Sequence, residues 1–368
     1  MSRTLALAII LLGAPISRVT AQGSIAQQVA RAPDGIVRVQ YASRAGACGD
    51  GQDVIGLGQA IFMESMQSYG GHWTADRCRP GPVRVALSVT GGRVTQLKTY
   101  VGGGWSAAPG RVTDLGTVPS AEAATYFFAL VPQLEGRSKR ERLLLPAVLA
   151  DDPNAVPRLT ALARDPARTT EMRRESIHWI GLLGDASVVP TLVAFVRQAP
   201  LTAVRANDDD DEGPGEDGIG TAAVAALSFV RNHAGVAALI DFARSGQSQV
   251  RRSAIFWLGQ SGEPRALATL HTIIENPKEP DALRSGAIFS LSHGDSIPAA
   301  EFAYLRGMYP RLASTRLKES ILMGMADERS SSGGWLRVRS KDVQPISRRR
   351  QPGQTVGGAS AHRTSSSR

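Results

Sequence analysis

One phrase occurs twice in this chain. "RRESIHWIGLLGD" begins at Arg173, and "RRSAIFWLGQSGE" begins at Arg251, 78 positions later. Counted from the residue before the second copy, the apolar residues fall at i, i+4, i+5 and i+8, as Val250, Ala254, Ile255 and Leu258, which places them on one face of an α-helix. A helix that is rewritten along the chain indicates a repeat protein rather than one closed globular core.

The repeat unit is shorter than the 78 residues that separate the two copies. The apolar residue directly before each copy belongs to a series of five aligned positions, which are Met172, Ile219, Val250, Leu283 and Leu317. A second helical series alternates with the first, as "VPRLTALAR" at 156–164, "VPTLVAFVR" at 189–197, "VAALIDFAR" at 236–244 and a fourth copy around Leu270. Gly-Asp or Gly-Glu pairs separate the two helices of a pair, as expected just past a helix end. Two short helices cannot bury an apolar face alone, so the pairs must stack into a solenoid.

The pattern "R-x-x-A-[IV]-x-x-L-G" followed by "VP-x-L" resembles the HEAT repeat family. It is most similar to the short HEAT-like repeats that are also seen in phycobilisome lyases, and it covers roughly residues 138–327. The resemblance implies a mainly α fold, a HEAT-like α-solenoid over 136–327, that binds a protein or peptide along its concave surface. A minority of the family acts on chromophores, but no cysteine that could attach one lies in this array.

One repeat is longer than the others because of an acidic insertion. "NDDDDEGPGEDG" occupies residues 207–218, and removing about 14 residues there restores the period. Asp208, Asp210 and Glu212 alternate as the ligands of a calcium loop do, but Ile219 stands where the bidentate Glu belongs. We favour an exposed, solvated loop and leave calcium binding as the alternative.

The chain begins with the pattern of a cleavable signal peptide over 1–21. Arg3 precedes an apolar run from Leu5 to Ala14 that is too short to span a bilayer, and Ala21 ends a small-residue cleavage site. We therefore predict a periplasmic or secreted protein with no transmembrane segment.

The two cysteines fit that compartment. Cys48 and Cys78 are the only ones, and an even pair in an exported protein predicts one disulfide. A metal site with His72, which lies between them, is the weaker alternative, because the close ligand doublets of zinc sites are missing.

A small α+β domain is predicted over 22–135. Alternating β-rich runs around Gly91-Gly92 predict a hairpin over 83–103, and 35–44 reads as a further strand. Residues 54–70 are expected to form a helix. Ser120 is expected to cap a helix over 121–134 that links this domain to the array.

The positive charge of the chain is concentrated at its ends. Of the net charge of +9, residues 328–368 contribute +7 and residues 1–21 contribute +2. The folded body is close to neutral, so we do not expect it to bind nucleic acid. The region 328–368 reads as a disordered basic tail that could touch an anionic surface. Alternatively, a truncation or frameshift has removed the partner of a helix that ends near Met325.

No catalytic, cofactor-binding or metal-ligating residue is predicted. The histidines are scattered, and His178 aligns with Phe256 and Phe289 of other repeats. A column of cations could face an acidic partner, and its members are Arg173, Arg251, Arg284 and Lys318. The alternative is that they pair with nearby carboxylates, such as Asp185, Glu263 and Asp295.

These patterns together predict a non-enzymatic, exported repeat scaffold that mediates protein–protein interaction through its solenoid surface and needs no cofactor. The alternative is an envelope sensor, a ligand-binding protein or a degraded enzyme, with its site in the N-terminal α+β domain.

Overall fold

The fold is taken from a computed structural model of the chain. The structure describes residues 23–57, 60–63, 78–135, 142–198, 218–292 and 299–332. The predicted signal peptide, the acidic insertion up to residue 217 and the tail from residue 333 onward lie outside the described residues.

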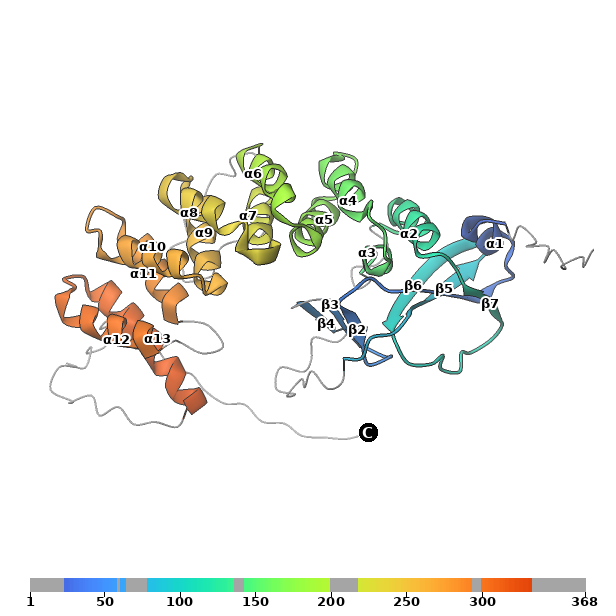
Figure 1. The fold of residues 1–368 in the computed structure, drawn as a ribbon, viewed down its shortest axis with the longest axis horizontal. Coiled ribbons are helices and arrows are strands. Elements are labelled where there is room, and N and C mark those ends of the chain that lie inside the picture. Colours follow the sequence, from blue (N-terminus) through green and yellow to red (C-terminus); the bar gives the residue numbers. More distant parts are fainter. Residues whose placement is uncertain are drawn as a thin grey trace, which may run out of the picture.

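A four-stranded sheet forms the centre of the N-terminal domain (Figure 1), in the order β6-β5-β1-β7. The strands are β1 (Gly35–Tyr41), β5 (Val83–Thr90), β6 (Arg93–Val101) and β7 (Val112–Thr117). β1 runs antiparallel to β5 and parallel to β7. The predicted hairpin is confirmed as β5 and β6, and Gly91 and Gly92 adopt the positive φ angles that its two-residue turn requires.

Helices cover one face of this sheet. They are α1 (Ile25–Arg31), α2 (Ser120–Leu134) and α3 (Leu145–Leu149). The Tyr41 ring of β1 lies 5.9 Å from that of Phe127, and its hydroxyl donates to the carbonyl of Pro146 at 2.6 Å. Ser120 does not cap α2 as predicted, because Pro119 occupies the cap position and the Ser120 hydroxyl donates to the carbonyl of Ala42.

A second, three-stranded sheet occupies residues 54–57 and 60–63, where the sequence predicts the first part of a helix over 54–70; residues 64–70 lie outside the described residues. Its strands are β2 (Ala47–Gly49), β3 (Val54–Leu57) and β4 (Ala60–Met63), in that order. Gly56 and β-branched residues lower the helix propensity of this segment, and antiparallel pairing with β2 supplies its hydrogen bonds. The predicted disulfide between Cys48 and Cys78 is present, and it fastens β2 to the chain just before β5.

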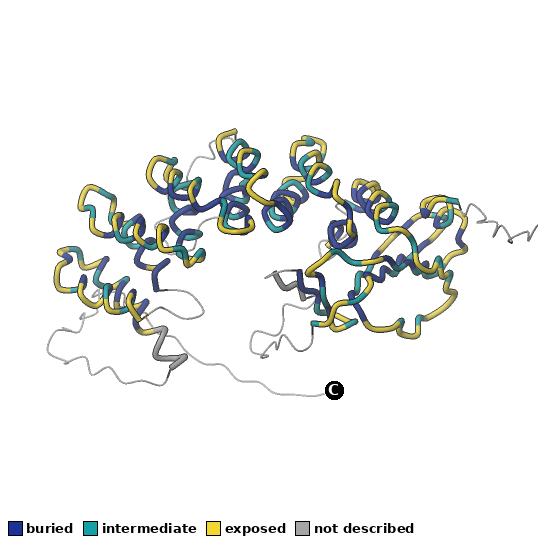
Figure 2. Tube along the Cα trace, in the orientation of Figure 1, coloured by how far each residue is buried: buried dark blue, intermediate teal, exposed yellow. Residues whose placement is uncertain are grey.

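The repeats form an arched array of five helix pairs within the described residues (Figure 1). The outer helices are α4 (Ala155–Arg164), α6 (Val189–Gln198), α8 (Val236–Ser245), α10 (Pro264–Glu275) and α12 (Ala299–Met308). The inner helices are α5 (Thr170–Leu183), α7 (Ile219–Phe229), α9 (Ser248–Ser261), α11 (Asp281–Ser292) and α13 (Thr315–Ser332). Figure 2 shows that buried residues lie where these helices face their neighbours.

The inner helices pack directly on one another along the arch. Glycines make this packing close at two places. A Cβ atom on Gly181 would lie 2.3 Å from the carbonyl oxygen of Ala226, and one on Gly259 would lie 2.4 Å from that of Ser290. These contacts explain why the repeated phrase places glycine after its last core leucine or isoleucine in α5 and α9.

The last inner helix is longer than predicted. α13 continues to Ser332, so the prediction of a helix ending near Met325 is wrong, as is that of a disordered tail over 328–332. At the other end of the array, the amide of Arg44 donates to the carbonyl of Leu149 at 2.8 Å, and Ser43 pairs with Ala150. The segment after β1 is therefore hydrogen-bonded to the end of α3, just before the first helix pair of the array.

Substitution of Gly259 by Ala is expected to destabilise the array. The added methyl group meets the Ser290 backbone, and overpacking of this kind costs about 1–3 kcal/mol. Gly286→Ala in α11 is the matched control, because a Cβ atom there meets nothing within 4 Å and should raise stability by up to about 1 kcal/mol. Urea unfolding followed by circular dichroism compares the two variants. Equal midpoints would contradict the close packing of α9 on α11.

Removal of the disulfide is expected to destabilise the N-terminal domain. The bridge closes a loop of 30 residues, which in the chain-entropy model stabilises the fold by about 3–4 kcal/mol. A variant with Cys48→Ala and Cys78→Ala should unfold at lower urea concentration, and dithiothreitol should lower the midpoint of the wild type but not that of the variant. A wild-type midpoint that does not respond to reductant would count against this role.

Candidate functional site

Three members of the predicted cation column hold the ends of outer helices. Arg173, Arg251 and Arg284 each lie in the first turn of an inner helix, and each Nε donates at 2.9 Å to a carbonyl in the last turn of the preceding outer helix. The acceptors are Ala163 in α4, Ala243 in α8 and Ile274 in α10. A cation there satisfies an unpaired carbonyl and complements the helix dipole. The column therefore has a recurring structural task.

The carboxylates that meet this column differ from those predicted. Arg251 pairs with Glu279 at 2.8 Å, and Arg284 pairs with Asp281 at 3.2 Å. The Lys318 ammonium lies 5.7 Å from the centre of the Tyr309 ring. Of the expected partners, Asp185 accepts hydrogen bonds from Ser187, and Glu263 lies 3.9 Å from the His233 Nε2. Asp295 falls outside the described residues. A partner-binding role of the column stays a prediction.

An aromatic row crosses the inner helices from α5 to α9. We define it as His178, Phe229, Trp257 and Phe256. Successive ring centres lie 5.0, 5.2 and 5.1 Å apart, and each pair meets edge to face. Edge-to-face contacts of this kind contribute about 0.5–1.5 kcal/mol each beyond area burial. The row joins the inner helices of three consecutive repeats.

The same helical position continues this apolar surface to the end of the array. The residue six places after each series start is His178, Ala225, Phe256, Phe289 or Met323. At 100° per residue this position lies opposite the core positions of the inner helix, on the inner edge of the arch. Phe289 is 42% exposed and Met323 is 65% exposed. Aromatic and sulfur-containing side chains thus occupy a position where a purely structural helix would carry polar ones.

Leu322 adds to the exposed surface for a definable reason. The equivalent residue in each earlier inner helix is fully buried, as Ile177, Val224, Ile255 and Ile288. Each of these faces the next inner helix along the array. Leu322 is 39% exposed, because no inner helix comes after α13 among the described residues. Three of the four exposed large apolar residues in the described part of the chain therefore lie on α11 and α13, and the fourth is Val112.

Two titratable groups on α5 are shifted by burial. Burial raises the pKa of Glu175 to about 7, partly offset by the Trp179 indole N–H, which donates to its carboxylate at 3.4 Å. Burial lowers the pKa of His178 to about 4, and the Arg142 charge acts in the same direction. His178 is therefore neutral at pH 7 and packs as an aromatic ring, which fits its alignment with phenylalanines.

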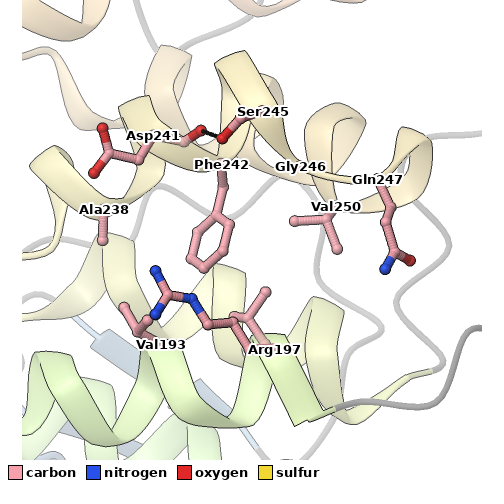
Figure 3. A pocket seen from close by; sticks show the side chains of 10 residues that line it. Val193, Arg197, Ala238, Asp241, Phe242, Ser245, Gly246, Gln247 and Val250 are labelled. Carbon is pink, nitrogen blue, oxygen red and sulfur yellow. Dashed lines mark hydrogen bonds between the residues drawn. The ribbon is translucent and has the colours of Figure 1, made fainter.

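A cavity lies on the outer side of the array between α6 and α8 (Figure 3). It has a volume of about 310 Å³, and its lining includes Val193, Arg197, Asp241 and Phe242. Figure 3 shows the Phe242 ring pointing toward Arg197. The preceding repeat has the same arrangement, with the Arg164 guanidinium 5.9 Å from the centre of the Phe195 ring. The cavity is thus lined by a contact that recurs in the repeat.

The open face of the N-terminal sheet holds a buried cation. Arg84 donates to the backbone carbonyls of Gly51, Gly102 and Gly104, and its guanidinium lies 5.0 Å from the centre of the Trp105 ring. These bonds tie the segment after β6 to the disulfide-linked sheet. Arg84 therefore has a structural task in the N-terminal domain.

Within the described residues, no three or more His, Cys, Asp or Glu side chains are grouped so that they could hold a metal ion. The structure also shows no helix long and apolar enough to cross a membrane over that part of the chain. Sequence reasoning missed Phe229, Leu322 and Met323. Alignment of every inner helix by its core positions would have placed Met323 beside Phe256, whereas the exposure of Leu322 depends on the packing at the end of the array.

Comparison with known proteins agrees with the repeat architecture. The model of the PBS lyase HEAT-like repeat matches residues 250–276, which hold most of α9 and all of α10. No match was found among curated proteins. The complex of CpcE and CpcF of phycocyanin lyase from Nostoc sp. PCC7120 is similar at 20% identity with a TM-score of 0.31, covering 47% of this chain and 99% of that one.

Human deoxyhypusine hydroxylase is similar at 16% identity with a TM-score of 0.26, covering 56% of this chain and 84% of that one. Both TM-scores are low, and no activity of either protein is inferred for this chain. The matched repeat and the five stacked helix pairs show that the chain is a HEAT-like repeat protein.

Proposed function

We propose that this chain is a non-enzymatic, exported scaffold that binds a protein partner along the inner edge of its helical array. The observation that carries the proposal is the apolar surface formed by the aromatic row, Phe289, Leu322 and Met323. Apolar side chains that gather on a solvent-facing edge are characteristic of protein interaction sites. The arch presents them along one continuous edge that spans the inner helices.

Several observations support a binding role over a catalytic one. The neutral His178 packs against Phe229, and its shifted pKa follows from burial among rings. The arginines in the first turns of α5 and α9 donate to carbonyls of outer helices. In both cases packing or hydrogen bonding within the fold explains why the polar side chain is there. The proposal therefore assigns no residue to a chemical step.

Two features support export. The apolar run near the N-terminus and the small residues before position 22 have the pattern of a signal peptide. The disulfide between Cys48 and Cys78 is of the kind that persists in oxidising compartments. Both features support the proposal of a periplasmic or secreted protein.

Loss of the apolar inner edge is expected to abolish partner binding. The test is a variant with Phe256→Ser, Phe289→Ser and Met323→Ser, compared with wild type by crosslinking capture from envelope extract and quantitative mass spectrometry. Val112→Ser is the matched control, because Val112 is exposed but lies on β7. Partners captured by the wild type and the control should be lost from the triple variant, with unchanged circular dichroism. Equal capture by all three proteins would overturn the proposal.

A further inference from the structure

Both copies of the repeated phrase begin with two adjacent arginines, and the two arginines have different surroundings. The first of each doublet, Arg173 or Arg251, is bonded to the end of an outer helix. The second, Arg174 or Arg252, is half-buried and forms no ion pair with any described residue. The Nε of Arg174 is buried without an acceptor, and Glu171, one turn earlier, does not pair with it. The first arginine of each doublet has a structural role in the fold, whereas no contact within the described residues gives the second one such a role.

The second arginines lie on the inner edge beside the aromatic row. Arg174 precedes His178 by four residues, and Arg252 precedes Phe256 by four, so cation and ring share one face of each helix. α7 lies between α5 and α9, and its equivalent positions carry the small Thr221 and Ala225. The inner edge thus has two cation-and-ring positions separated by one helix with short side chains.

A carboxylate is the natural complement of such an arginine. A guanidinium N–H that is removed from water without an acceptor costs about 1–3 kcal/mol, and a carboxylate restores two parallel, charge-assisted bonds. Each described carboxylate that is ion-paired with an arginine is bound to a different one, such as Glu279 to Arg251 and Asp281 to Arg284. We expect a bound partner to supply the acceptor that the buried Arg174 Nε lacks, and the half-buried Arg252 offers a second guanidinium on α9.

The spacing of the two arginines sets the spacing of those acceptors. Neighbouring packed helices lie about 8–10 Å apart, so α5 and α9, which flank α7, are separated by about 16–20 Å. An extended chain advances about 3.3 Å per residue, which places the two carboxylates five or six residues apart. The residue midway between them would face Ala225 and the neighbouring rings, where an apolar side chain fits.

We propose that the inner edge across α5, α7 and α9 binds an extended acidic segment of a partner protein. This segment carries two carboxylates five or six residues apart, with an apolar residue between them. Arg174 and Arg252 bind the carboxylates, and the aromatic row contacts the apolar residue. The inference rests on the proposed function and adds the chemistry of the partner.

A synthetic peptide tests the proposal with the full mature chain, residues 22–368. The labelled probe has two Asp residues six positions apart with Phe midway, and binding is followed by fluorescence anisotropy. Wild type should bind this probe, and added salt should weaken the binding. A peptide with Lys in place of both Asp should not bind.

The decisive variant is Arg174→Ala with Arg252→Ala, which is expected to weaken binding of the acidic probe at least tenfold. The matched control is Arg244→Ala with Arg265→Ala, which removes the same charge from exposed positions on the outer helices α8 and α10 and should bind as wild type does. Arg174→Lys with Arg252→Lys keeps the charge and should bind with intermediate affinity, because lysine cannot form the bidentate pair.

Two outcomes overturn the inference. One is equal binding of the probe by the decisive variant and the outer-helix control. The other is that wild type binds neither the probe nor versions with Asp spaced five or seven positions apart. If the triple inner-edge variant nevertheless loses its captured partners, the proposed function stands and only the acidic segment is wrong. If capture is unaffected by that variant, the proposed function fails separately.

Discussion

The side-by-side packing of the inner helices is the constraint on which the rest of the structure depends. Ile177, Val224, Ile255 and Ile288 are each buried by the next inner helix, and Gly259 lets two backbones approach closely. No single helix pair has this burial by itself, because the covering surface belongs to its neighbour. The same packing turns the residues opposite the core toward one common edge, so the proposed site is a consequence of the stacking.

Much of the array could be predicted from the sequence, because its information is local. Short stretches of sequence show the helical period, the glycine after the last core residue and the spacing of the repeats. The helix pairs lie where these patterns predict them. The segment after Val54 was misread because its strand pairing with β2 depends on residues elsewhere in the chain. Ser120 was misplaced by one residue, a difference that only the contact with Ala42 decides.

The candidate site was less accessible from sequence for a related reason. Two adjacent arginines look equivalent until the rotation of the helix is known. In the structure Arg173 donates to the carbonyl of Ala163, whereas Arg174 is half-buried and its Nε has no acceptor among the described residues. In the same way, Leu322 reads as one more core residue, and its exposure is decided only by the packing at the end of the array. The sequence shows which residues are present, but only the structure shows which way each side chain points.

Native-state hydrogen exchange is the most direct test of mutual burial as the source of the fold. Stability in a stacked array depends on neighbours, so amides of α7, α9 and α11, which have an inner helix on both sides, should exchange most slowly. Amides of α13, with one inner neighbour among the described residues, should exchange faster by at least an order of magnitude. Uniform protection across all the inner helices, or slowest exchange in α13, would contradict the account.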